Sequence, residues 1–253
     1  MTQPGRHAFV TGGGSGIGLA VAKALDGAGW RVTIAGRTKE KLQAASREMR
    51  SAAVQTVDVT DPPSVTSALA GAIELYGPIT LLVNNAGGVV SAPFEKTGAA
   101  TWRQAIDLNL MGAVYCAQGV LPGMKAAGWG RIVNIASTAG LVGYRYVSAY
   151  VAAKHALVGF TKALALEVAK SGVTVNAVCP GFTDTAIVAD AVKTISQTTK
   201  RSNEEALATF TSTNPQGRLV RPDEVAAAVL WLTSEEAGAV NGVALPIAGG
   251  EVA

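Results

Sequence analysis

A tyrosine and a lysine four residues apart are the most chemically informative pair in this sequence. Tyr150 and Lys154 stand at i and i+4 of an alanine-rich stretch, so in a helix they share one face. A phenol with an ordinary pKa of about 10 is a poor base near neutral pH, and a nearby ammonium group would lower that pKa. The spacing therefore predicts a phenol that exchanges a proton with an alkoxide or a carbonyl oxygen.

Two further polar residues precede this pair in the chain. Ser137 follows a strand-like segment, where its hydroxyl could donate to a substrate oxygen and stabilise negative charge. Asn109 lies in a long helical stretch. Singly, these residues could be a strand-end cap, a helix kink or a surface Tyr–Lys pair. Taken together after a glycine-rich turn, they predict a catalytic set of Asn109, Ser137, Tyr150 and Lys154.

The glycine-rich turn is Thr11-Gly-Gly-Gly-Ser-Gly-Ile-Gly18, placed between an apolar run and a helical stretch. Backbone N–H groups and the helix dipole at such a turn hold a pyrophosphate. The spacing G-x-G-x-x-G is not literally present, and a turn that needs positive φ is the alternative explanation. The turn holds more glycines than that alternative requires. We therefore expect cofactor contacts from Gly12, Gly14, Ser15, Gly16, Ile17 and Gly18.

Short apolar runs alternate with amphipathic stretches along the chain. Strands are expected at 7–11, 31–35, 54–59, 80–83, 131–136, 173–178 and 243–247, and helices at 17–28, 40–50, 62–76, 101–127, 149–170 and 222–232. This alternation predicts an α/β, Rossmann-type, doubly wound seven-stranded parallel sheet. A single domain over 1–253 is expected. A long, polar and weakly helical segment at about 184–221 is expected to be a substrate lid.

Several motifs occur in order at the expected strand ends and helices: Asn84-Asn-Ala-Gly87, Asn109, Ser137, Tyr150-x-x-x-Lys154 and Pro180-Gly181. With the glycine-rich turn, they resemble the single-domain branch of the short-chain dehydrogenase/reductase family over the whole chain. Residues 130–138 and 175–182 are most similar to those of 3-oxoacyl-thioester reductases and aromatic polyketide ketoreductases. The resemblance implies hydride transfer between NAD(P)(H) and a ketone or secondary alcohol. A 3-oxoacyl thioester of CoA or an acyl carrier is the favoured substrate.

The resemblance also assigns roles to individual residues. Asn109 would position a water molecule, and Lys154 would reach the nicotinamide ribose. Arg37, at the end of the second strand where no acid stands, favours NADP(H). Ser15 stands where many NADP-preferring relatives carry a second basic residue, so NAD(H) remains the alternative. The other implied cofactor contacts are Asp58, Val59, Asn85, Ala86, Gly87, Pro180, Gly181, Thr183 and Thr185.

The substrate itself is left open by the residues around the expected site. The expected wall is apolar or weakly polar and suits a ketone or acyl chain: Val89, Val90, Thr138, Tyr144 and Val147. Arg145, Lys193, Lys200 and Arg201 are available for a phosphate-bearing tail, while a carrier-protein partner is unsupported. A small or aromatic secondary-alcohol dehydrogenase using NAD and a catalytically silent dinucleotide sensor are the alternatives. Larger epimerase relatives share the Tyr–Lys motif but need a further substrate domain.

Composition excludes other classes. Apolar residues make up 49% of the chain and charged residues 15%, which excludes intrinsic disorder. A net charge of +3 without a basic face argues against nucleic acid, and two cysteines with two histidines argue against a metal site. Residues 1–7 are polar, and neither a secretory signal nor a membrane span is expected. We expect a cytoplasmic protein, and the resemblance implies a homotetramer that pairs helices 101–127 and 149–170.

Overall fold

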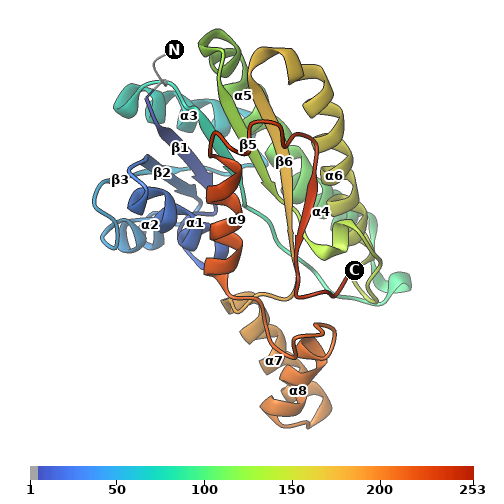
Figure 1. The fold of residues 1–253 in the computed structure, drawn as a ribbon. Helices are drawn as coiled ribbons and strands as arrows, with labels where there is room; N and C mark the ends of the chain where they lie inside the picture. Colours follow the sequence, from blue (N-terminus) through green and yellow to red (C-terminus); the bar gives the residue numbers. More distant parts are fainter. Residues whose placement is uncertain (1–4) are drawn as a thin grey trace.

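The computed structural model describes residues 5–253; most of the polar N-terminal segment, in which no secretory signal is expected, lies outside the described residues. Seven strands form one parallel sheet in the order β3-β2-β1-β4-β5-β6-β7 (Figure 1). Their bounds are His7–Thr11 (β1), Arg31–Gly36 (β2), Ala52–Thr56 (β3), Leu81–Asn84 (β4), Gly130–Ile135 (β5), Val173–Pro180 (β6) and Ala244–Ile247 (β7). The predicted fold class is confirmed.

The strand order reverses between β1 and β4, which are hydrogen-bonded neighbours. In an open parallel sheet, the connections that leave two such strands run to opposite faces and open a crevice at the carboxyl ends. The glycine-rich turn follows β1, and Asn85 to Gly87 follow β4. Topology therefore brings both predicted cofactor segments to the same crevice.

Helices cover the sheet on both faces (Figure 1). Helices α1 (Gly16–Gly27), α2 (Lys39–Ser46) and α9 (Pro222–Leu232) pack on one face, where Val10, Ile34 and Val133 point. Helices α3 (Pro62–Tyr76), α5 (Gly112–Ala127) and α6 (Ser148–Val168) pack on the other, where Phe9 and Ile132 point. Since successive side chains of a strand point to opposite faces, one apolar strand supplies both cores.

In the sheet and the helices that cover it, two element boundaries differ from the sequence prediction by more than two residues. Strand β3 occupies Ala52–Thr56 rather than 54–59, so Asp58 and Val59 lie beyond its end. Helix α2 ends at Ser46 instead of running to Arg50. The physical reason is that the Arg50 backbone N–H donates to Asp26 Oδ2 at 3.1 Å, which ties the chain to the end of α1 in a turn.

The predicted helix 101–127 is not regular. It consists of α4 (Ala99–Ile106), a π-helical turn (Asp107–Met111) and α5, without a break in the chain direction. A π-helical turn inserts a residue into the helical repeat and re-aims the side chains around it, and such turns are frequent at functional sites. Asn109 lies at its centre. The sequence carried no periodicity signal for this turn because it is a single insertion.

The predicted lid is an insertion with two helices, α7 (Ala186–Thr199) and α8 (Asn203–Thr211). Both project beyond the carboxyl ends of the strands (Figure 1). The two ends of the insertion are hydrogen-bonded, because Asp184 N donates to Val220 O at 2.8 Å and Val220 N donates to Phe182 O at 2.9 Å. Within residues 5–253, no helix has the length and apolar character needed to cross a membrane.

Candidate active site

The glycine-rich turn is a backbone cradle in which side chains are excluded. Gly12 and Gly16 have φ values of +65° and +52°, a region that glycine adopts without strain. A Cβ on Gly18 would lie 2.3 Å from the carbonyl oxygen of Gly12. The third glycine is therefore required by close approach of the helix to the turn rather than by its φ.

Contacts from β4 fix this cradle in position. The backbone N–H groups of Asn85 and Ala86 both donate to Thr11 Oγ1, at 2.9 and 3.0 Å. Asn85 Nδ2 donates in turn to the carbonyl oxygen of Thr11 at 3.0 Å. Asn85 thus binds the turn through its side chain, and Thr11 is a positioning residue that the sequence prediction did not single out.

The residues present fit a dinucleotide pyrophosphate. Ser15 is the N-cap of α1, its side chain makes no capping hydrogen bond, and the first turn contains no acidic residue that would repel an anion. A Cβ on Gly16 would lie 3.2 Å from Thr185 Cγ2, so the start of the lid lies directly across the cradle. Glycine backbone and a hydroxyl-bearing residue therefore face each other at this point.

The part of the site that is predicted to bind the adenosine half of the cofactor is exposed to solvent. Arg37 directly follows β2 and is exposed to solvent. Thr60 donates to Asp58 Oδ1 through its hydroxyl at 2.7 Å and its backbone N–H at 2.9 Å. These bonds, with a smaller contribution from the Arg37 charge, hold the pKa of Asp58 below its usual value. A fixed cation and an ionised carboxylate therefore stand at the ends of neighbouring strands.

The lysine of the predicted catalytic set is held at the end of β5. Lys154 is 4% exposed, and its Nζ donates to the carbonyl oxygen of Ile135 at 2.8 Å. The same atom lies 5.7 Å from the centroid of the Tyr150 ring and 3.6 Å from where a Cβ on Gly87 would stand. Burial lowers the pKa of Lys154 to about 8. The geometry places this amine between the tyrosine and the predicted cofactor segment.

The expectation that Tyr150 has a lowered pKa is wrong for the chain without ligands. Burial raises the pKa of the phenol, and a hydrogen bond with Ser137 opposes this rise. Tyr150 is therefore protonated at neutral pH and is ready to donate a proton rather than to accept one.

Ser137 is oriented by the backbone that follows it. It is the N-cap of the short 3-10 helix Thr138–Gly140, and its Oγ accepts from the N–H of Ala139 at 3.0 Å. With that lone pair occupied, the hydroxyl proton is available for an oxygen in the cleft. Ser137 thus stands beside Tyr150 as a second hydroxyl that can donate a hydrogen bond.

Asn109 is 2% exposed and bonds to the backbone through both ends of its amide. Its Oδ1 accepts from Gly88 N at 3.1 Å, and its Nδ2 donates to the carbonyl oxygens of Gly88 and Ala105, both at 3.0 Å. The π-helical turn aims this amide at the segment after β4. In the described contacts it holds Gly88 in place.

A buried polar chain aligns the helix that carries the tyrosine with the central strands. Asn84 Nδ2 donates to Asn134 Oδ1 at 2.9 Å, and Asn134 Nδ2 donates to Thr161 Oγ1 at 2.8 Å. Thr161 then donates to the carbonyl oxygen of Leu157 at 2.8 Å. The chain links β4, β5 and α6 and thereby sets the position of α6 along the sheet.

Comparison with known proteins agrees with this geometry. The family model described as short chain dehydrogenase matches residues 6–196. A candidate ketoacyl reductase of Streptomyces coelicolor is 42% identical over 98% of both chains. The D-beta-hydroxybutyrate dehydrogenase of Cupriavidus necator is 39% identical, also over 98% of both. A variant of actinorhodin polyketide ketoreductase solved with NADPH superposes with a TM-score of 0.94, at 41% identity over 98% of this chain and 97% of that one.

The chain belongs to the short chain dehydrogenase family. It is an NAD(P)(H)-dependent oxidoreductase that acts on CH–OH groups and the corresponding ketones, and its substrate is a small molecule. The resemblance drawn from the sequence motifs is confirmed at the level of the family and the reaction class. The roles of individual residues stay predictions.

The structure also describes the surroundings of four further residues of this short chain dehydrogenase. Cys179 is buried, and burial raises the pKa of its thiol to about 11, so it remains a thiol at neutral pH. His155 Nδ1 bonds to the carbonyl oxygen of Val151 one turn earlier and is exposed. After β6, Thr183 Oγ1 donates to Gly181 O at 3.0 Å, and Thr185 Oγ1 donates to Thr183 O at 3.2 Å. These bonds shape the segment predicted to meet the nicotinamide.

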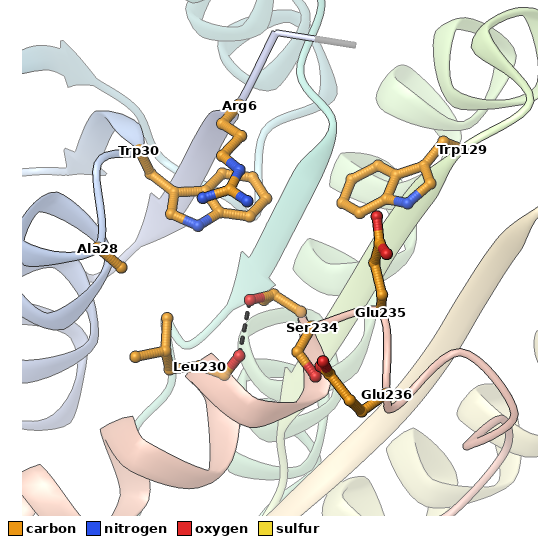
Figure 2. Close-up of a pocket in the computed structure, with 9 residues that line it drawn as sticks. Arg6, Ala28, Trp30, Trp129, Leu230, Ser234, Glu235 and Glu236 are labelled. Atoms are coloured by element: carbon orange, nitrogen blue, oxygen red, sulfur yellow. Dashed lines mark hydrogen bonds between the residues drawn. The ribbon is translucent and has the colours of Figure 1, made fainter. Parts of the chain in front are cut away.

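Two cavities stand on opposite edges of the sheet. The smaller, about 140 Å³, is lined by Tyr150, Asn109 and Val89 and adjoins the catalytic residues. The larger, about 350 Å³, is lined by Arg6, Trp30 and Trp129, which directly precede β1, β2 and β5 (Figure 2). The larger cavity therefore lies at the amino ends of the strands, whereas the predicted catalytic residues lie at the carboxyl ends.

Proposed function

We propose that this short chain dehydrogenase is an NADP(H)-preferring ketoreductase that reduces a 3-oxoacyl thioester or a related ketone. The observation that carries the proposal is the convergence of Tyr150, Ser137 and Lys154 beside Gly87, at the crevice that also holds the glycine cradle. A proton donor, a second hydrogen-bond donor and a nucleotide site then meet at one edge of the sheet. This is the arrangement that reduction of a carbonyl requires.

The chain supplies the proton for reduction. The bound nicotinamide would supply the hydride to the carbonyl carbon. Tyr150 Oη gives its proton to the carbonyl oxygen as negative charge develops there, and the Ser137 hydroxyl donates a hydrogen bond to the same oxygen. The raised pKa of Tyr150 keeps the phenol protonated until that charge forms. The product alcohol has gained one hydride and one proton.

Lys154 and Asn109 would support this transfer by positioning the cofactor and the backbone beside it. The Lys154 amine faces Gly87, where it would meet the ribose of the nicotinamide and remain hydrogen-bonded to Ile135. Asn109 holds Gly88 through two hydrogen bonds and so fixes the backbone beside the cofactor. In this role Asn109 is a positioning residue.

The assignment of Tyr150 is tested by Tyr150→Phe. A reductase keeps nucleotide binding and loses kcat by about 10²- to 10⁴-fold, the usual contribution of a positioned general acid. Nucleotide binding is measured by fluorescence titration and turnover by nicotinamide absorbance. A catalytically silent sensor would show no turnover in the unmodified chain either. Normal turnover by the phenylalanine variant would refute the mechanism.

The preference for NADP(H) rests on Arg37. Its guanidinium is exposed at the end of β2, no acidic residue stands at that strand end, and a 2′-phosphate would accept charge-assisted hydrogen bonds from it. The kcat/KM with NADPH should exceed that with NADH, and Arg37→Ala should remove most of the difference. The second candidate function is an NAD-dependent secondary-alcohol dehydrogenase, and it is supported by Ser15, because position 15 carries no basic side chain. Equal or better use of NADH by the unmodified chain would favour this second candidate.

The substrate class is proposed from the apolar wall and from the relatives. The S. coelicolor relative is a candidate ketoacyl reductase, and the C. necator relative is a D-beta-hydroxybutyrate dehydrogenase, whose name places the reacting oxygen on a 3-hydroxy carbon. A panel of 3-oxoacyl-CoAs, simple ketones and secondary alcohols, assayed with both cofactors, tests this. Turnover of cyclic or aromatic alcohols alone would overturn the thioester assignment.

Three further predictions belong to this proposal. The chain acts as a single domain over 1–253 whose segment 184–221 closes on the substrate. It assembles as a homotetramer through the helical segment 101–127, which includes α5, and through α6, and the 81% exposure of Leu166 on α6 supports an apolar contact there. It works in the cytoplasm. Light scattering of the purified protein tests the assembly.

A further inference from the structure

A carboxylate that the motifs did not point to lies at the edge of the active site. Glu251 follows β7, and its Oε1 accepts a hydrogen bond from Tyr144 Oη at 2.6 Å. Tyr144 Oη also lies 2.8 Å from Thr138 Oγ1. Thr138 is the neighbour of Ser137 in the chain, so these contacts bring Glu251 to the loop that carries the proposed second proton donor.

The other side of Glu251 faces the loop that follows β6. A Cβ on Gly181 would lie 2.6 Å from Glu251 Oε2. The next residue, Phe182, packs edge-on against Tyr144 at 5.9 Å between ring centroids and against Phe210 of α8 at 5.0 Å. Glu251 therefore lies between the loops after β5 and β6, below the lid, and it contacts Tyr144, which is near enough to Tyr150 to interact with it electrostatically.

The hydrogen bonds around Tyr144 can be assigned from their donors. A phenol has one proton, and an ionised carboxylate can only accept. The Tyr144 proton is thus donated to Glu251, and the Thr138 hydroxyl donates to Tyr144 in turn. Glu251 Oε2 is buried without a hydrogen-bond partner among residues 5–253, and the ion pairs of these residues do not include Glu251. The cluster offers acceptors and one negative charge.

We propose that Glu251 selects the substrate by the charge of the group next to the reacting carbonyl. Substrates in which this group is uncharged or donates a hydrogen bond are accepted, and substrates in which it is a carboxylate are rejected. This inference rests on the proposed ketoreductase function and narrows its substrate class. An anion brought beside a partly buried carboxylate is repelled with little screening. A thioester or an ester is neutral at this position, and a hydroxyl or amine would donate to the carboxylate.

The test compares two substrates that share one 3-oxo group. Ethyl 3-oxobutanoate is neutral and 3-oxobutanoate is an anion, and each is reduced with NADPH by the full chain. We expect the unmodified protein to show kcat/KM for the ester about tenfold or more above that for the anion. Glu251→Gln retains an acceptor for Tyr144 and removes the charge, so it should raise kcat/KM for the anion about tenfold and change that for the ester little. Glu236→Gln, at the opposite edge of the sheet, is the matched control.

The outcomes are separable. Turnover by the unmodified chain with an ester-to-anion ratio that Glu251→Gln leaves unchanged overturns this inference alone. Absence of turnover with either substrate, and with the wider substrate panel, is a failure of the proposed function. If the glutamine variant does not fold, the unmodified protein still decides: a ratio near one or below contradicts charge selection, and a large ratio that falls as salt is added supports it.

Discussion

Replacing Gly18 by alanine tests whether the glycine cradle works by close backbone approach. The added Cβ would lie 2.3 Å from Gly12 O and 2.5 Å from Asn85 Nδ2. A real Cβ atom essentially never lies within 3.0 Å of a non-bonded heavy atom, so the turn must move by at least 0.7 Å, the difference between 3.0 and 2.3 Å. The first atom is backbone and the second is the amide that binds the turn, so neither is free to give way.

The expected effects follow from that displacement. Overpacking of this kind costs about 1–3 kcal/mol, and a protein of this size loses roughly 2–4 °C in Tm per kcal/mol. The Tm should therefore fall by roughly 2–12 °C. The backbone N–H groups of the glycine-rich turn would bind the pyrophosphate, and the added Cβ displaces them. The KM for NADPH should therefore rise by about tenfold or more.

Gly27→Ala is the matched control, because it makes the same change at the other end of α1. A Cβ there has no atom within 4 Å, and alanine is the better helix former by up to about 1 kcal/mol. Its Tm should be unchanged or higher and its KM unchanged. Differential scanning fluorimetry and steady-state kinetics measure both variants. If Gly18→Ala matched this control in Tm and KM, the described cradle would be wrong.

Two predictions concern stability. The pKa of Lys154 is lowered from 10.5 to about 8, so between these pH values the unfolded chain holds a proton that the folded chain lacks, and the free energy of unfolding rises with pH. Urea denaturation at pH 7.5 and 10 should show the unmodified protein gaining at most about 3 kcal/mol of unfolding free energy relative to Lys154→Met. A difference between the two proteins that does not grow with pH contradicts the lowered pKa. Thr161→Val leaves Asn134 Nδ2 without its acceptor and should cost about 1–3 kcal/mol of unfolding free energy. The control Thr198→Val, on the exposed face of α7, should change the unfolding free energy by less than about 0.5 kcal/mol. Equal losses in the two variants would refute the role of the buried hydrogen-bonded chain that ends at Thr161.

The sequence predicted those features that depend on local pattern. Apolar runs of strand length, amphipathic stretches and turn glycines define seven parallel strands and their order of connection. The carboxyl ends of parallel strands meet at one edge, and for that reason Ser137, Gly87 and Thr185 could be expected near Tyr150 before any coordinates were known.

Features that depend on contacts between distant residues could not be predicted. The π-helical turn around Asn109 is one inserted residue in an otherwise helical pattern. The raised pKa of Tyr150 comes from burial, which neither the motif nor the lysine spacing encodes. Glu251 meets Tyr144 across 107 positions of the chain, and its only sequence signal is a lone acid after two glycines.

The hydrogen-bonded ends of the segment 184–221 have an evolutionary and practical consequence. Because Phe182 and Asp184 pair with Val220, the insertion leaves and re-enters the fold at a single point. Its length and composition can therefore change without altering the register of any strand in the sheet. Doubling such a loop adds only about 0.6 kcal/mol in closure entropy. Helices α7 and α8 thus form an insertion that can be exchanged as a unit. Chimeras that replace it should retain the proposed catalytic residues at the carboxyl ends of the strands and acquire a different substrate preference.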